Sequence, residues 1–66
     1  MRKIELAPYQ QKQLEATLLQ SIRECNAGMK LCNEEGNRRG YDYIKEVKRK
    51  PLIKKLYAVR NGYIFE

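Results

Sequence analysis

The first half of the chain carries one long helical pattern. Pro8 suits the first position of a helix, Gly36 is a suitable C-terminal stop, and the residues between them are rich in Gln, Glu, Leu and Ala, which favour helices. The pattern predicts a helix over residues 8–34, preceded by a short half-buried strand over residues 2–6. Apolar residues recur along the helix at intervals of three or four and form one face: Leu14, Leu18, Ile22, Cys25, Met29 and Cys32.

A second helix is expected after a polar loop over residues 34–40. Asp42 has the right side chain to cap the helix, because its carboxylate can accept hydrogen bonds from the exposed N–H groups. Ile44 and Val47 would form its inner edge. Pro51 predicts that this helix ends at Lys50, since the residue before a proline avoids the α region.

The last fifteen residues allow two structures. As a helix, they have an apolar stripe of Leu52, Leu56 and Val59 with Gly62 as the stop. As a hairpin, residues 55–60 and 63–66 flank Asn61-Gly62, a dipeptide that favours a two-residue turn with positive φ at both positions. The Tyr, Val, Ile and Phe content favours the hairpin, in which Val59 would face Ile64.

These elements predict a single α+β domain over residues 1–66 with the order β-α-α-β-β. The strand over residues 2–6 would join the C-terminal hairpin as a third strand, and both helices would pack on that small sheet. A three-helix all-α fold is the alternative. A compact chain of this length has a radius of gyration of about 11 Å.

The net charge of +6 lies entirely in the second half of the chain. Residues 1–36 hold five cations and five acids, whereas residues 37–66 hold nine cations, three acids and five of the six aromatic residues. Cations that bind phosphates, together with rings that stack on unpaired bases, are typical of nucleic-acid binding. The predicted nucleic-acid site is Arg38, Arg39, Lys45, Lys48, Arg49, Lys50, Lys54, Lys55 and Arg60.

The same basic half has other interpretations. It could bind an acidic protein partner, or it could simply be a solvated surface that keeps the chain soluble. A helix broken at Lys50-Pro51 and followed by a third helix would also resemble a helix-turn-helix arrangement, with Lys54, Lys55 and Arg60 on the recognition helix.

The apolar face of the first helix has two interpretations as well. It could pack on the chain's own second helix and sheet, or part of it could remain uncovered. An uncovered part could pair with another copy in a homodimer or occupy a groove on a host protein. The predicted self-association residues are Leu14, Leu18, Ile22, Cys25 and Met29.

The composition argues against catalysis. The chain has no His, one Ser, one Thr and one Asp, so it cannot form a Ser-His-Asp triad, and its sequence contains no zinc motif. Cys25 and Cys32 lie seven residues apart on the predicted helix, about 10.5 Å in rise, which is too far for a disulfide. We therefore expect a protein that is not an enzyme, with no metal and no cofactor.

No run of 18 apolar residues is present, and Glu5 and Pro8 interrupt the N-terminal segment where a signal peptide needs an apolar stretch. This predicts a cytoplasmic protein with no membrane contact. The favoured hypothesis is a small regulatory protein that binds nucleic acid or a ribonucleoprotein through its basic half. The alternative is an inhibitor or adaptor, of the kind that phages and mobile elements encode, which docks on an acidic surface of a larger host protein.

Overall fold

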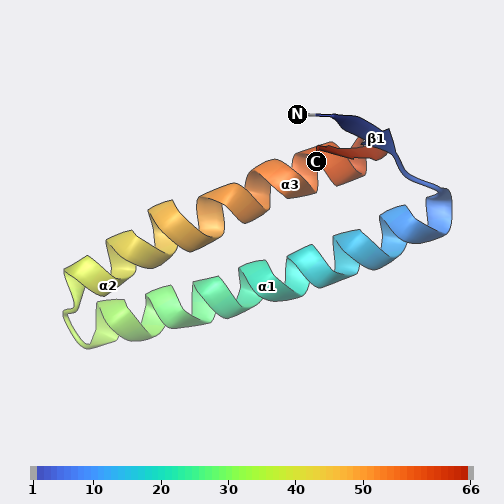
Figure 1. Ribbon diagram of the computed structural model, residues 1–66. Helices are drawn as coiled ribbons and strands as arrows, with labels where there is room; N and C mark the ends of the chain where they lie inside the picture. Colours follow the sequence, from blue (N-terminus) through green and yellow to red (C-terminus); the bar gives the residue numbers. More distant parts are fainter. Residues whose placement is uncertain (1, 66) are drawn as a thin grey trace.

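The chain folds as a helical hairpin whose open end is closed by two short strands (Figure 1). The computed structural model describes residues 2–65. In chain order the elements are β1 (Lys3–Glu5), α1 (Pro8–Glu34), α2 (Arg38–Tyr43), the π-helical segment η1 (Ile44–Arg49), α3 (Lys50–Arg60) and β2 (Tyr63–Phe65). Because α2, η1 and α3 follow one another without a gap, residues 38–60 form one helix, which we call the second arm. It runs antiparallel to α1.

The predicted long helix is confirmed at both ends. At its start, Pro8 is the first helical residue, and the side chain of Gln10 accepts a hydrogen bond from the backbone N–H of Ala7 at 3.0 Å. At its end, Gly36 takes a φ of +71°. Asn37 N–H then donates to the Cys32 carbonyl at 2.7 Å, which is the six-to-one bond of a Schellman turn. This turn reverses the chain direction.

The second helix differs from the prediction at its start and at its end. Asn37, not Asp42, is the N-cap, and its side chain accepts from the Gly40 N–H at 3.0 Å. The predicted end at Lys50 is also wrong, because the helix continues through Pro51. The π-helical turns of η1 lie directly before the proline, and Lys50 N–H donates to the Lys45 carbonyl, five residues back. These wider turns accommodate a ring that would otherwise clash with the carbonyl four residues earlier.

The predicted hairpin between residues 55–60 and 63–66 is wrong, and the helical alternative is correct for this segment. Residues 55–60 belong to α3, so Val59 faces the helical core rather than Ile64. Asn61 has a φ of −86°, which excludes a turn with two positive φ angles. Gly62, with a φ of +86°, ends the helix, and its N–H donates to the Val59 carbonyl at 2.9 Å.

The α+β class is confirmed, and the three-helix all-α alternative is wrong. The strand that follows Gly62 pairs with β1 and not with the segment before the turn. The two strands are antiparallel, with Ile4 opposite Ile64 and Lys3 opposite Phe65. Glu66, the last residue of the predicted strand, lies outside the described residues. This pairing holds β1 and β2 together beside α3.

The core is small because the hairpin is only one layer of helices thick. Within residues 2–65 the buried apolar side chains are Ile22, Leu56, Ala58 and Val59, and Val59 is 1% exposed. The molecule measures 42 × 23 × 13 Å. Its radius of gyration of 13.9 Å exceeds the predicted value of about 11 Å for a compact chain.

The close packing at the turn yields a test of the fold. A Cβ on Gly40 would lie 2.7 Å from Asn37 Nδ2 and 3.0 Å from Cys32 Sγ. The G40A variant should therefore displace the Asn37 side chain and lose its cap, which costs about 1 kcal/mol of unfolding free energy. This cost offsets the gain of about 1 kcal/mol that alanine normally brings over glycine in a helix, so chemical denaturation should show no net stabilisation. In the G40A background, N37A should then cost little; a full additive cost would contradict displacement of the cap.

Candidate nucleic-acid interface

The structure places all nine predicted cations on the second arm, but it does not gather them into one patch. Residues of an α-helix share a face when they are three or four positions apart. Arg49 is four positions after Lys45, and the same spacing leads on to Ile53 and Tyr57. Lys54 and Lys55 fall outside this series, so they point to other sides of the arm.

Two of the nine cations reach across to α1. Arg49 Nε donates to Asn26 Oδ1 at 2.8 Å, and Arg60 Nε lies 3.2 Å from Glu15 Oε1. The backbone carbonyl of Arg60 also accepts from Gln11 Nε2 at 3.0 Å. Arg49 and Arg60 therefore tie the two arms together on one face of the molecule.

These contacts identify further cations on the same face, this time from α1. Lys12 is three residues before Glu15, which Arg60 contacts, so both lie on one flank of the helix. Arg23 and Lys30 lie three residues before and four residues after Asn26, which Arg49 contacts. All three of these cations are exposed. The neutral first half of the chain thus contributes positive charge where the second arm does.

The sequence interpretation missed these three residues because it compared the two halves by net charge. The signal that could have found them is spacing: the series 12, 15, 19, 23, 26 and 30 advances by three or four residues and is one flank of a helix. We call the combined surface the basic face. Its cations are Lys12, Arg23, Lys30, Arg38, Lys45, Arg49 and Arg60.

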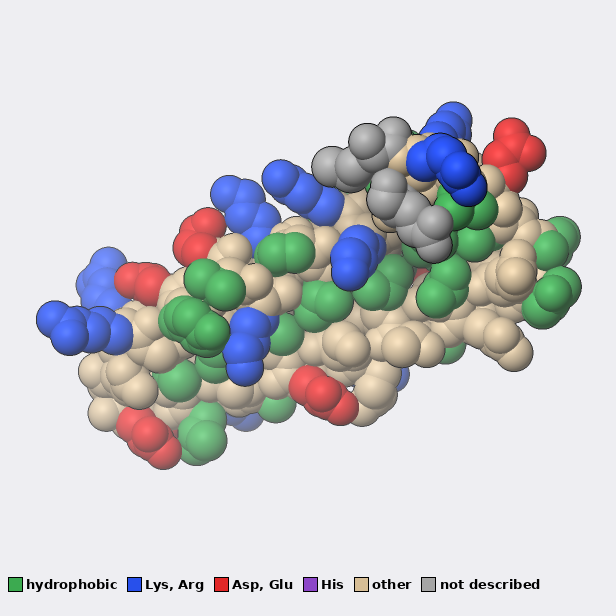
Figure 2. All heavy atoms as spheres, in the orientation of Figure 1, with side chains coloured by type: hydrophobic (Ala, Val, Ile, Leu, Met, Phe, Trp, Pro, Cys, Tyr) green, Lys and Arg blue, Asp and Glu red, His purple; other side chains and the backbone are tan. Residues whose placement is uncertain are grey.

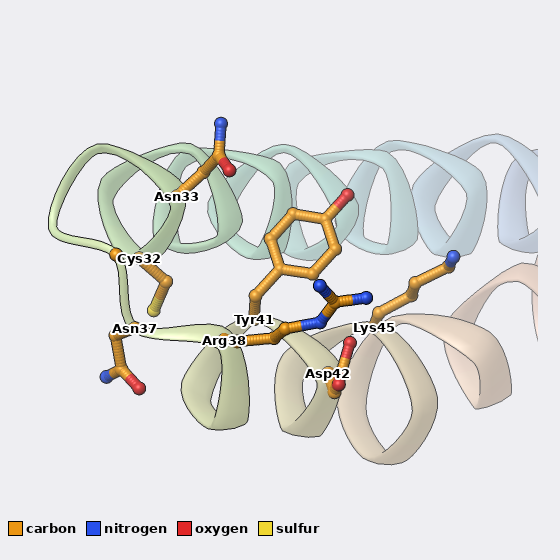
Figure 3. Close-up of a pocket in the computed structure, with 8 residues that line it drawn as sticks. Cys32, Asn33, Asn37, Arg38, Tyr41, Asp42 and Lys45 are labelled. Carbon is orange, nitrogen blue, oxygen red and sulfur yellow. The ribbon is translucent and has the colours of Figure 1, made fainter.

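A depression of about 510 Å³ extends the basic face toward the turn of the hairpin. Arg38 and Lys45 line it, and in Figure 3 both side chains extend in the same direction along the arm, while Tyr41 crosses toward α1. Asp42 projects beside them and offsets part of the charge. The depression is lined by Cys32, Asn33, Gly36, Asn37, Arg38, Tyr41, Asp42 and Lys45.

The remaining predicted cations have other surroundings. Lys50 Nζ lies 3.5 Å from Glu46 Oε2 in an exposed ion pair, which contributes little to stability. Lys48 Nζ lies 5.8 Å from the ring centroid of Tyr43. Arg39, Lys54 and Lys55 are exposed. The helix-turn-helix alternative is wrong, because the second arm is unbroken at Lys50-Pro51.

The predicted self-association stripe packs mainly inside the hairpin. Ile22 is buried, while Leu14, Leu18, Cys25 and Met29 are half-buried. The stripe is covered because the second arm, at 23 residues, is longer than the predicted second helix between Asp42 and Lys50. A single layer still leaves the outer side of these four residues accessible.

The chemistry of the described residues is that of a surface rather than an enclosed site. Cys25 and Cys32 are free thiols and half-buried. Within residues 2–65, His, Cys, Asp and Glu side chains nowhere gather in threes as a metal ion would need. No helix in the described part of the chain has the length and apolar character to cross a bilayer.

No protein-family model matches the chain, and neither a curated protein nor a solved structure does.

The contact between Arg49 and Asn26 yields a second prediction. The N26A variant should lower the unfolding free energy by about 1 kcal/mol, because it removes the acceptor of a charged hydrogen bond. Asn33 provides a matched control: it lies on the same flank, is exposed, and makes no side-chain hydrogen bond within residues 2–65. N33A should have a smaller effect in the same denaturation experiment. Equal losses would mean that the bond contributes nothing.

Proposed function

We propose that the chain is a small, non-enzymatic regulatory protein that binds the phosphate backbone of nucleic acid, alone or in a ribonucleoprotein, through its basic face. The observation that carries this proposal is that both arms present cations on one side of the molecule. Arg49 and Arg60 fix that side through their contacts with Asn26 and Glu15.

The charge of the basic face suits an extended polyanion. Seven cations share it with Glu15, which Arg60 already contacts, with Glu34, four residues after Lys30, and with Asp42 near the turn. The α1 cations are spread over about 27 Å, the rise from Lys12 to Lys30. Each neutralised phosphate releases counterions, so a row of exposed Lys and Arg side chains supports binding without base readout.

Two exposed tyrosines lie beside these cations. Tyr9 is three residues before Lys12, and Tyr57 follows Arg49 by two steps of four. Both side chains are 66% exposed, although an aromatic ring normally gains from burial. Exposed rings next to cations are suited to stacking on unpaired bases, which favours binding of single-stranded segments as well as duplex backbone.

The proposal places the protein in the cytoplasm, where its two free thiols would stay reduced. The basic face could also receive an acidic surface of a larger protein, as an inhibitor or adaptor would. That alternative has no feature of its own in the structure. It becomes the favoured function if nucleic acid does not bind.

The test compares two triple variants that remove the same charge. Replacing Lys12, Arg23 and Lys30 by Gln should lower the affinity for a short fluorescent duplex. It should also reduce the slope of log K against log salt by up to about 2.7, because each lost phosphate contact is worth about 0.9. The control replaces Arg39, Lys54 and Lys55 by Gln, and its slope should stay near that of the unmodified protein. Fluorescence anisotropy over a salt series measures both.

Two results would contradict the proposal. If both triple variants weaken binding equally, the protein responds to net charge and the basic face is not a site. If duplex DNA, duplex RNA and single strands all fail to bind at low salt, the nucleic-acid function is excluded. Capture of partners from a nuclease-treated lysate, repeated with the K12Q/R23Q/K30Q variant, would then examine the acidic-protein alternative.

A further inference from the structure

The side of α1 away from the basic face is apolar and incompletely covered. Residues that recur every three or four positions along this flank are all half-buried. Near the turn, Ile44 Cδ1 would lie 3.1 Å from a Cβ on Gly28, and Cys32 Sγ would lie 3.0 Å from one on Gly40. Both contacts show that the side of the second arm that carries Gly40 and Ile44 lies next to this flank. The α1 residues of the flank are Leu14, Leu18, Ser21, Cys25 and Gly28, with Cys32 at its end, where it also lines the depression of the basic face.

The second arm adds two exposed apolar side chains to this side. Tyr43 is three residues after Gly40, and Val47 is four residues after Tyr43, so the helical spacing carries both onto the flank that Gly40 marks. Each is 54% exposed. We call the flank together with Tyr43 and Val47 the apolar face. Figure 2 shows apolar side chains gathered between the two arms over much of the length of the molecule, with some Lys or Arg side chains among them. One cation beside this face is Lys48, whose Nζ lies 5.8 Å from the ring centroid of Tyr43.

The surface area of the chain indicates how much of it remains to be covered. A compact monomer of 7.9 kDa is expected to expose about 4,400 Å², whereas this chain exposes 5384 Å². The excess of about 1,000 Å² is close to the roughly 800 Å² that each partner buries in a standard protein interface. The molecule is only 13 Å thick, a single layer of helices, whereas domains are built from two layers packed around a core.

We infer that the apolar face binds a second copy of this chain, so that two hairpins stack into a symmetric four-helix dimer. Two copies supply the missing second layer and enclose Leu14, Leu18 and Cys25 in a core. In such a contact both copies use the same face, so Tyr43 and Val47 of each copy are covered at once. The basic faces then point outward on opposite sides of the dimer.

The dimer should respond to salt in the opposite direction from nucleic-acid binding. Each chain carries a net charge of +6, so two copies repel, and added salt screens that repulsion while leaving apolar burial in place. Binding to phosphates weakens over the same range of salt. Dimer formation and nucleic-acid binding can therefore be disproved independently. A mass measurement made without nucleic acid depends only on dimer formation.

The experiment measures the mass of the full chain by sedimentation equilibrium at moderate and high salt. The unmodified protein should have twice the 7.9 kDa chain mass, with tighter association at high salt. The variant Tyr43→Glu with Val47→Glu should have the mass of one chain. The matched control, Tyr9→Glu with Tyr57→Glu, changes two residues that are also exposed (66% against 54%) by the same charge, off the apolar face, and should remain a dimer.

Folding of the variants is checked by far-UV circular dichroism, and a second measurement needs no variant. The melting temperature of the unmodified chain should rise with protein concentration, because association stabilises the folded state by mass action. A single-chain mass at high salt and high concentration would overturn the inference. So would a melting temperature independent of concentration, or a dimer that survives both glutamates on the apolar face.

Discussion

Pro51 sets the constraint on which the rest of the structure depends. The ring removes one N–H from the hydrogen-bond ladder and would clash with the carbonyl four residues earlier in an ordinary helix. The π-helical turns of Ile44–Arg49 widen the helix just before this point, so the second arm continues instead of ending. A second arm that ended at Lys50 would leave the N-terminal half of α1 without a partner.

The same π turns also align the two ends of the second arm. Ile44 and Leu56 are twelve residues apart and would point about 120° away from each other on an unbroken α-helix. In the structure Ile44 lies next to Gly28 of α1, and Leu56 is buried as well. The wider turns rotate the first part of the arm back toward α1. Pro51, which predicted a break, therefore follows the π-helical turns that allow the second arm to pack along α1.

The sequence predicted the elements whose signals are local. The intervals of three and four from Leu14 to Cys32, together with Pro8 and Gly36, predicted α1 with both ends in place. Asn61-Gly62 was ambiguous because a glycine with positive φ serves equally well to end a helix or to turn a hairpin. Only the pairing of β2 with β1, across the whole chain, decides between them. Helical spacing within α1 is a local signal for Lys12, Arg23 and Lys30, but their combination with the cations of the second arm depends on how the two antiparallel arms pair, which no local signal gives.

This chain has two faces with different chemistry because it is only one layer of helices thick. In a domain with two layers the inner face of each layer is core, and only the outer faces meet solvent. Here both faces of one layer are exposed, and helical spacing assigns cations to one flank of α1 and small or apolar residues to the other. Arg49 and Arg60 sharpen the division, because their contacts with Asn26 and Glu15 hold their charges on the basic side. With its charge on one face and its apolar surface on the other, a chain of 66 residues would have room for both proposed contacts, a polyanion on the basic face and a second copy on the apolar face.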